Sequence, residues 1–264
     1  MGGDCGEADH TRVRARPLLA IIVGAMTVAA LVGAATTASA GRACLTTASE
    51  GGYSYAGHQA TYRGHGVRAT ITMTRAPSVD VGHVAGWVGV GGPGQGAGGE
   101  DAWIQAGIAS MPGMDPVIYA EITQGSAAPQ FIPIEEGVAF GRPHKLAVLE
   151  MSSRAGWWRV WVDGQAVTDP VQMRGSSGRW APIATAESWN AGTATCNEFG
   201  FRFERVSVSY GGGGSWRPFV PGHRFLNGGN QLRDLASAPA LTGVYNRTLA
   251  ADDVLPYAFA ASSS

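Results

Sequence analysis

Apolar and polar residues alternate in short stretches along most of this chain. The segment 199–210, FGFRFERVSVSY, alternates over its full length, and residues 67–73 show the same period. A period of two is typical of a β-strand with one buried face. The pattern predicts further strands at 84–90, 102–108, 117–122 and 146–151. No long segment carries the repeat of an amphipathic helix.

The clearest strand is the segment 156–165, GWWRVWVDGQ, in which aromatic and β-branched residues run into an Asp-Gly turn. Alternation sends Trp157 and Trp161 to one face and Trp158 to the other. One face is expected in the core. The face with Trp157 and Trp161 is either a substrate platform or a surface covered by packing.

Short strands punctuated by Gly, Pro and Asp-Gly predict an all-β fold, an antiparallel β-sandwich. The pattern weakens after Tyr210, yet Trp216, Phe219 and Phe225 follow. A free tail carries fewer large apolar groups, so this tail is expected to pack on the sandwich. The predicted organisation is a signal peptide at 1–40, a β-sandwich domain at 41–210 and a C-terminal extension at 211–264.

The first residues have the pattern of an export signal. Arg12, Arg14 and Arg16 precede an apolar run over 17–35, and the small residues of 38–40, Ala-Ser-Ala, follow. This pattern predicts cleavage after Ala40, a secreted protein and no stable membrane association afterwards. An uncleaved membrane anchor is the alternative, because the apolar run is long enough to span a bilayer.

The cysteine content is consistent with export, and the net charge narrows the classes of partner. Cys5 lies in the predicted leader, so Cys44 and Cys196 remain, and the oxidising compartment predicts a disulfide between them. Two buried thiols are the alternative. The net charge is −1, which suggests neither nucleic acid nor an anionic membrane surface as a partner.

Several common catalytic motifs are missing from the sequence. The histidines show no metal-ligand spacing, so neither a metal nor another cofactor is predicted. The Gly-rich stretch 91–99 lacks the Gly-Lys-Ser/Thr ending of a P-loop. No Gly-x-Ser-x-Gly elbow of a serine hydrolase occurs.

Two polar residues stand out among aromatic and small neighbours. Gln105 lies in the segment 102–107, AWIQAG, and Glu187 in the segment 185–189, TAESW. If both side chains leave the same face of one sheet, they can hold and activate a water molecule. A carboxylate can act as general base towards that water, and an amide can orient it and donate to an oxyanion.

The order of four segments resembles the glutamic peptidase (eqolisin) family. These segments are GWVGVGG at 86–92, AWIQAG at 102–107, the strand with Tyr119 and Glu121, and AESW at 186–189. The family consists of secreted β-sandwich enzymes with the concanavalin A-like jelly-roll architecture. The resemblance implies a secreted bacterial relative that acts on polypeptides as a metal-independent acid endopeptidase.

By this resemblance Gln105 and Glu187 match the family's catalytic pair. Glu187 would act first as base and then as acid, and Gln105 would orient the water and stabilise the oxyanion. The residues expected to bind substrate or support the pair are Trp87, Trp103, Glu121, Trp189, Trp157 and Trp161.

Two other functions fit the same residues. A non-catalytic concanavalin A-like module could bind glycan or peptide on the same face. A glycoside hydrolase could use Glu121 and Glu187 as its two carboxylates. Glu121 could also support the pair or simply face solvent.

Overall fold

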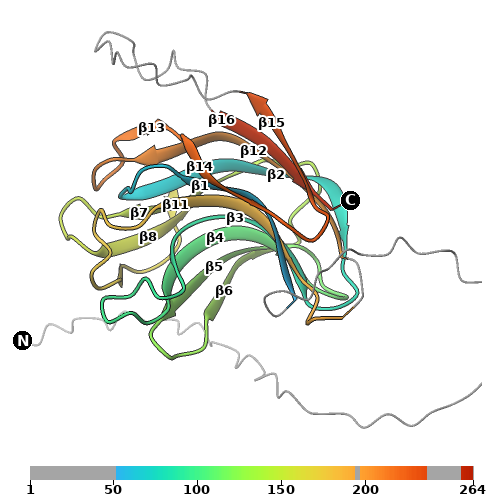
Figure 1. The fold of residues 1–264 in the computed structure, drawn as a ribbon, viewed down its shortest axis with the longest axis horizontal. Helices are drawn as coiled ribbons and strands as arrows, with labels where there is room; N and C mark the ends of the chain where they lie inside the picture. The colour runs from blue at the N-terminus through green and yellow to red at the C-terminus, as the bar shows by residue number, and fades with distance from the viewer. Residues whose placement is uncertain (1–51, 194–196, 237–256, 264) are drawn as a thin grey trace, which may run out of the picture. The chain divides into compact units, whose positions relative to one another are not determined.

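The computed structural model describes residues 52–193, 197–236 and 257–263, and it folds them into two antiparallel β-sheets (Figure 1). Every regular element among these residues is a strand, and none is a helix with the length and hydropathy of a bilayer span. The predicted all-β antiparallel sandwich is confirmed. The predicted leader at 1–40, Cys44 and Cys196 lie outside the described residues.

One sheet has seven strands in the order β14-β1-β11-β3-β4-β5-β6. Consecutive segments of the chain form its neighbouring strands β3, β4 and β5, and the loops 93–101 and 111–116 connect them. Its strands are β1 (Tyr53–Ala60), β3 (His83–Gly92), β4 (Ala102–Ser110), β5 (Val117–Gln124), β6 (Gln130–Glu136), β11 (Pro182–Trp189) and β14 (Pro221–Leu226).

The second sheet has nine strands. Its main order is β10-β8-β7-β2-β12-β16-β15, while β13 pairs with β12 and β9 with β8. Its strands are β2 (Gly66–Ser78), β7 (His144–Glu150), β8 (Trp157–Val162), β9 (Gln165–Ala166), β10 (Val171–Gln172), β12 (Glu198–Ser209), β13 (Trp216–Pro218), β15 (Gln231–Ala236) and β16 (Tyr257–Ser262).

The core lies between the two sheets and consists of alternate residues from their inner faces. Val88 and Ile104 of the seven-stranded sheet and Ile71 and Phe201 of the nine-stranded sheet are fully buried in one cluster. The close approach needs a glycine, since a Cβ on Gly86 would lie 2.6 Å from the Phe201 ring. Alternation therefore leaves each sheet with an outer face that turns away from the core.

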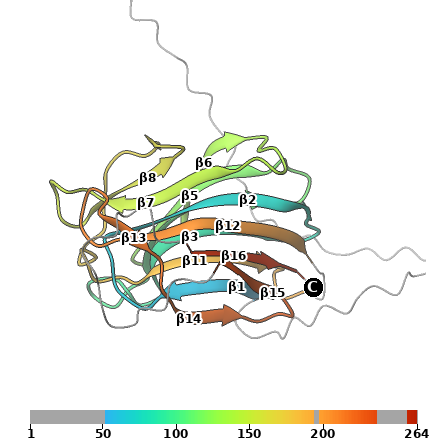
Figure 2. The same cartoon turned by 90° about the horizontal axis from the view of Figure 1, so that it is seen from above.

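The segment after Tyr210 supplies strands to both sheets. Strand β14 pairs with β1, and β16 pairs with β12 (Figure 2). Phe259 of β16 stacks on Phe203 with ring centroids 4.5 Å apart, and both rings are fully buried. These residues are thus part of the sandwich core.

The face assignment within β8 follows the sequence pattern. Trp158 is fully buried in the core, while Trp157 and Trp161 turn to the outer face and are half-buried. Strand β8 belongs to the nine-stranded sheet, whereas Gln105 and Glu187 lie in the seven-stranded sheet. Trp157 and Trp161 therefore form no platform beside that pair. The prediction was wrong because alternation identifies the two faces of a strand but not the sheet to which the strand belongs.

Candidate active site

Three neighbouring strands, β11, β3 and β4, place Glu187 and Gln105 on one face. Glu187 pairs with Ala85 of β3, and Gln105 pairs with Gly89 of the same strand. Ala85 and Trp87 belong to a cluster on the outer face, separate from the main core. Since alternate residues share a face, Glu187 and Gln105 both leave the outer face, on either side of Trp87.

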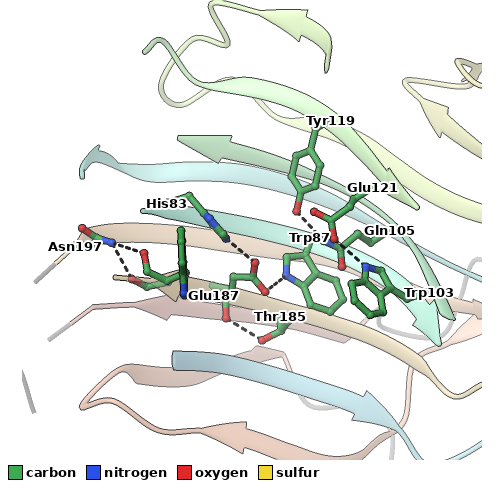
Figure 3. Close-up of polar contacts among 12 residues, drawn as sticks. His83, Trp87, Trp103, Gln105, Tyr119, Glu121, Thr185, Glu187 and Asn197 are labelled. Carbon is green, nitrogen blue, oxygen red and sulfur yellow. Dashed lines mark hydrogen bonds and ion pairs between the residues drawn. The ribbon is translucent and has the colours of Figure 1, made fainter. Parts of the chain in front are cut away.

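The Glu187 carboxylate is held by two side chains of β3. The Trp87 indole Nε1 donates to Oε2 at 3.0 Å, and His83 Nε2 lies 3.0 Å from Oε1 (Figure 3). The Glu187 residue is only 7% exposed. A buried carboxylate needs such partners, and here they also fix its orientation.

The Gln105 amide is directed by Tyr119 of β5. Gln105 Nε2 donates to the Tyr119 hydroxyl at 3.2 Å (Figure 3). Burial holds the pKa of Tyr119 well above its usual value, and the charges of Glu187 and Glu121 add to that rise. The phenol therefore stays protonated and accepts the amide hydrogen through its oxygen.

Gly107 makes room at the centre of this arrangement. It pairs with Trp87 on one side and with Tyr119 on the other. A Cβ at this position would lie 2.7 Å from Trp87 Cβ and 2.8 Å from Tyr119 Cε1. A glycine is thus required for both rings to lie where they hold Glu187 and Gln105.

Glu121 is a second carboxylate on the same face, paired with Gln105 across β4 and β5. Its Oε1 accepts from Trp103 Nε1 at 2.8 Å. Burial raises the pKa of Glu121, the Trp103 N–H offsets part of that rise, and the charge of Glu187 adds to it. Glu121 therefore lies within electrostatic reach of Glu187.

Aromatic rings surround the polar groups. Tyr53 stacks on Trp189 with centroids 6.0 Å apart, and His83 lies 5.7 Å from Trp189. On the other side Tyr119 stacks on Phe131 at 4.9 Å. The structure thus places Trp87, Trp103, Glu121 and Trp189 on the same face as the pair. Their roles in binding substrate or supporting the pair stay predictions.

Three residues of this face are not predicted as site residues from the sequence: His83, Tyr53 and Tyr119, although Tyr119 lies in one of the four segments of the resemblance. His83 and Trp87 are four residues apart in one strand, and Tyr119 precedes Glu121 by two residues. The period of two could have found these partners on the shared face. Within 52–193, 197–236 and 257–263, no group of three or more His, Cys, Asp or Glu residues could hold a metal ion.

Comparisons with known proteins give similarity at the level of structure. No protein-family model and no curated protein matches the chain. Scytalido-glutamic peptidase with a peptide-based transition-state analogue matches 80% of this chain and 97% of its own at 13% identity, with a TM-score of 0.46. SCP-B, a member of the eqolisin family of peptidases, matches 81% of this chain and 98% of its own at 13% identity, with a TM-score of 0.43.

A carbohydrate-binding protein is also similar. The module CBM66 from Bacillus subtilis matches 52% of this chain and 78% of its own at 12% identity, with a TM-score of 0.31. Identities this low assign no activity to the chain.

Proposed function

We propose that the protein is a secreted, metal-independent endopeptidase in which Glu187 and Gln105 activate water for peptide-bond hydrolysis. The observation that supports this function best is the shared outer face. Two polar side chains from β11 and β4, each 7% exposed, flank Trp87 with their orientations set by neighbours. Their burial and fixed orientation differ from those of a Glu and a Gln that only face solvent.

The chemistry follows from the two side chains. Ionised Glu187 takes a proton from the water that attacks the substrate carbonyl. An amide nitrogen carries two hydrogens, so Gln105 can donate one to the Tyr119 oxygen and the other to the oxyanion that forms. Protonated Glu187 then gives its proton to the leaving amine, which restores the carboxylate. Trp87 and His83 act as positioning residues for Glu187.

The test is cleavage of an unfolded protein from acid to neutral pH, with a chelator present. Glu187→Gln should lower kcat by about 10²–10⁴, the usual contribution of a general base. Glu136→Gln is the matched control, because Glu136 is an exposed residue of the same sheet. Cleavage by Glu187→Gln at the wild-type rate would exclude this mechanism.

Export is part of the same proposal and rests on the leader pattern at 1–40. Protein recovered from the culture medium should begin at Gly41. An N-terminus at Met1 in membrane-bound material would instead support the uncleaved anchor.

A glycoside hydrolase is the second candidate. Its supporting observation is that Glu121 and Glu187 share the face and that burial raises the pKa of Glu121, as expected of a general acid. Neutral β-glucans incubated with wild type, Glu121→Gln and Glu187→Gln test it. Release of reducing sugar that both substitutions abolish would favour this function over the peptidase.

A further inference from the structure

The outer face of the nine-stranded sheet has a cavity of about 620 Å³, on the other sheet from Glu187 and Gln105. This volume is within the range of about 300–1,000 Å³ for small-molecule sites. Four cationic and two indole side chains from β2, β7, β8, β12 and β13 line it: Arg68, Lys145, Arg159, Arg205, Trp161 and Trp216.

The hollow is built by a small residue between larger ones. Ala147 of β7 pairs with Trp161 of β8 on one side and with Arg68 of β2 on the other. Arg205 comes from the irregular part of β12, where the pairing register shifts, and its φ is 53°. A bulge of this kind redirects a side chain, and a left-handed non-glycine residue is a strained conformation that often marks a functional site.

The cations have no anionic partner among the described residues. The structure gives no ion pair for Arg68, Lys145, Arg159 or Arg205 there, whereas Arg75, Arg142 and Arg202 are each paired with a glutamate. The acidic groups nearby are already engaged. Glu150, which also lines the cavity, contacts His65 and accepts from the Gly156 amide, and Glu204 pairs with Arg202.

Crowding of like charge makes this face receptive to an anion. Burial lowers the pKa of Arg68, and the neighbouring charge of Arg205 lowers it further. The Arg68 guanidinium carbon lies 4.5 Å from the centroid of the Trp216 ring, a cation–π contact. Arg159 Nε and Trp161 Nε1 are buried donors without a hydrogen-bond partner in the part of the chain that the structure describes. Buried donors normally have an acceptor, and both of these unsatisfied residues line the cavity.

We infer that this face is a binding site for an acidic polysaccharide, with uronate carboxylates on the arginines and sugar rings on Trp161 and Trp216. The length of the site favours a polymer over a small anion. Four strand spacings separate β8 from β13, or about 19 Å at about 4.8 Å each. The mixture of indoles, cations and the hydroxyls of Thr70, Ser152 and Ser153 matches a chain that carries apolar ring faces, hydroxyls and carboxylates.

The experiment is calorimetric titration of the full chain with oligogalacturonate, with neutral dextran oligosaccharide and polyglutamate of similar length as comparisons. Wild type should bind oligogalacturonate, and its affinity should fall as the salt concentration rises. It should bind the dextran oligosaccharide and polyglutamate far more weakly. Arg68→Gln/Arg205→Gln should raise Kd by about tenfold or more, since two charge-assisted contacts are lost. The control Arg142→Gln/Arg179→Gln removes the same charge from exposed positions outside the cavity and should bind like wild type.

A second variant fills the site without changing charge. Ala147→Leu places a larger side chain in the hollow and should abolish binding, while Glu187→Gln should leave it intact. Equal losses in the test and control pairs, equal binding of polyglutamate, or no binding of oligogalacturonate by wild type would each overturn the inference. Thermal unfolding confirms that each variant is folded. The result is independent of the peptidase proposal, because no residue of the Glu187 site is altered in the binding variants.

Discussion

The outer faces of the two sheets differ in how their polar groups are satisfied. On the seven-stranded sheet Glu187 accepts a hydrogen bond from Trp87 and contacts His83. Glu121 accepts a hydrogen bond from Trp103, and Gln105 donates one to Tyr119. On the nine-stranded sheet the cavity arginines lack an anionic partner among the described residues. The polar groups of the first face are therefore fixed by partners within the chain, whereas the cations of the second face have no anionic partner among the described residues. Substitutions on one face should therefore leave the proposed function of the other face unchanged.

After the loss of the Glu187 carboxylate, removal of the Gln105 amide should have the largest effect on peptidase activity. Gln105→Ala deletes the donor proposed to stabilise the oxyanion, so kcat should fall by about 10²–10³, as when one oxyanion donor is removed elsewhere. Peptidase kinetics measure this directly. Gln124→Ala, an exposed glutamine of neighbouring β5, should retain wild-type kcat. If the two variants were equally active, Gln105 would have no part in the reaction.

The indole donors of this face allow a matched comparison. Trp87→Phe removes the N–H that binds Glu187, and Trp103→Phe removes the one that binds Glu121. A hydrogen bond to a charged group contributes about 1.5–3 kcal/mol, so Trp87→Phe should lower the free energy of unfolding by that order. Its peptidase activity should also fall further than that of Trp103→Phe. The opposite ranking would identify Glu121 as the more important carboxylate.

Substitution of the central glycine, Gly107, should change stability through packing alone. Gly107→Ala introduces a Cβ against Trp87 and Tyr119 at less than normal contact distance, and overpacking of this kind typically costs about 1–3 kcal/mol. Denaturant unfolding measures the loss. Gly98→Ala is the control, since its Cβ would meet only the side chain of Glu100. A stability change of the same size there would point to a general effect of removing glycine.

The fold class and the polar pair could be predicted from the sequence because both depend on local alternation. The period of two within β4 and β11 predicts which residues share a face with Gln105 and Glu187. Sheet membership is not local. Trp161 lies on the second sheet because β8 pairs with β7, and nothing in its own segment specifies that partner.

Long-range strand pairing also explains the other features that the sequence does not predict. Strand β16 lies between β12 and β15, and its short apolar segment carries no signal for that place. The basic cavity also escapes sequence reasoning, since Arg68, Trp161 and Arg205 come from three strands and meet only through register and a bulge. The contact of His83 with Glu187 likewise depends on the pairing of β3 with β11.

The smallest expected effect is on stability, and it comes from the charge of Glu121. Burial holds its folded-state pKa above the usual 4.5, so above pH 4.5 the folded chain binds more protons than the unfolded chain. Stability then falls as pH rises through the raised pKa. Glu121→Gln stays neutral, and it should be more stable than wild type at neutral pH, with the difference vanishing below pH 4.5. Trp103→Phe should steepen the pH dependence, because it removes the N–H that offsets burial. Thermal unfolding across pH measures both, and a Glu121→Gln difference that grows towards acid would refute this account.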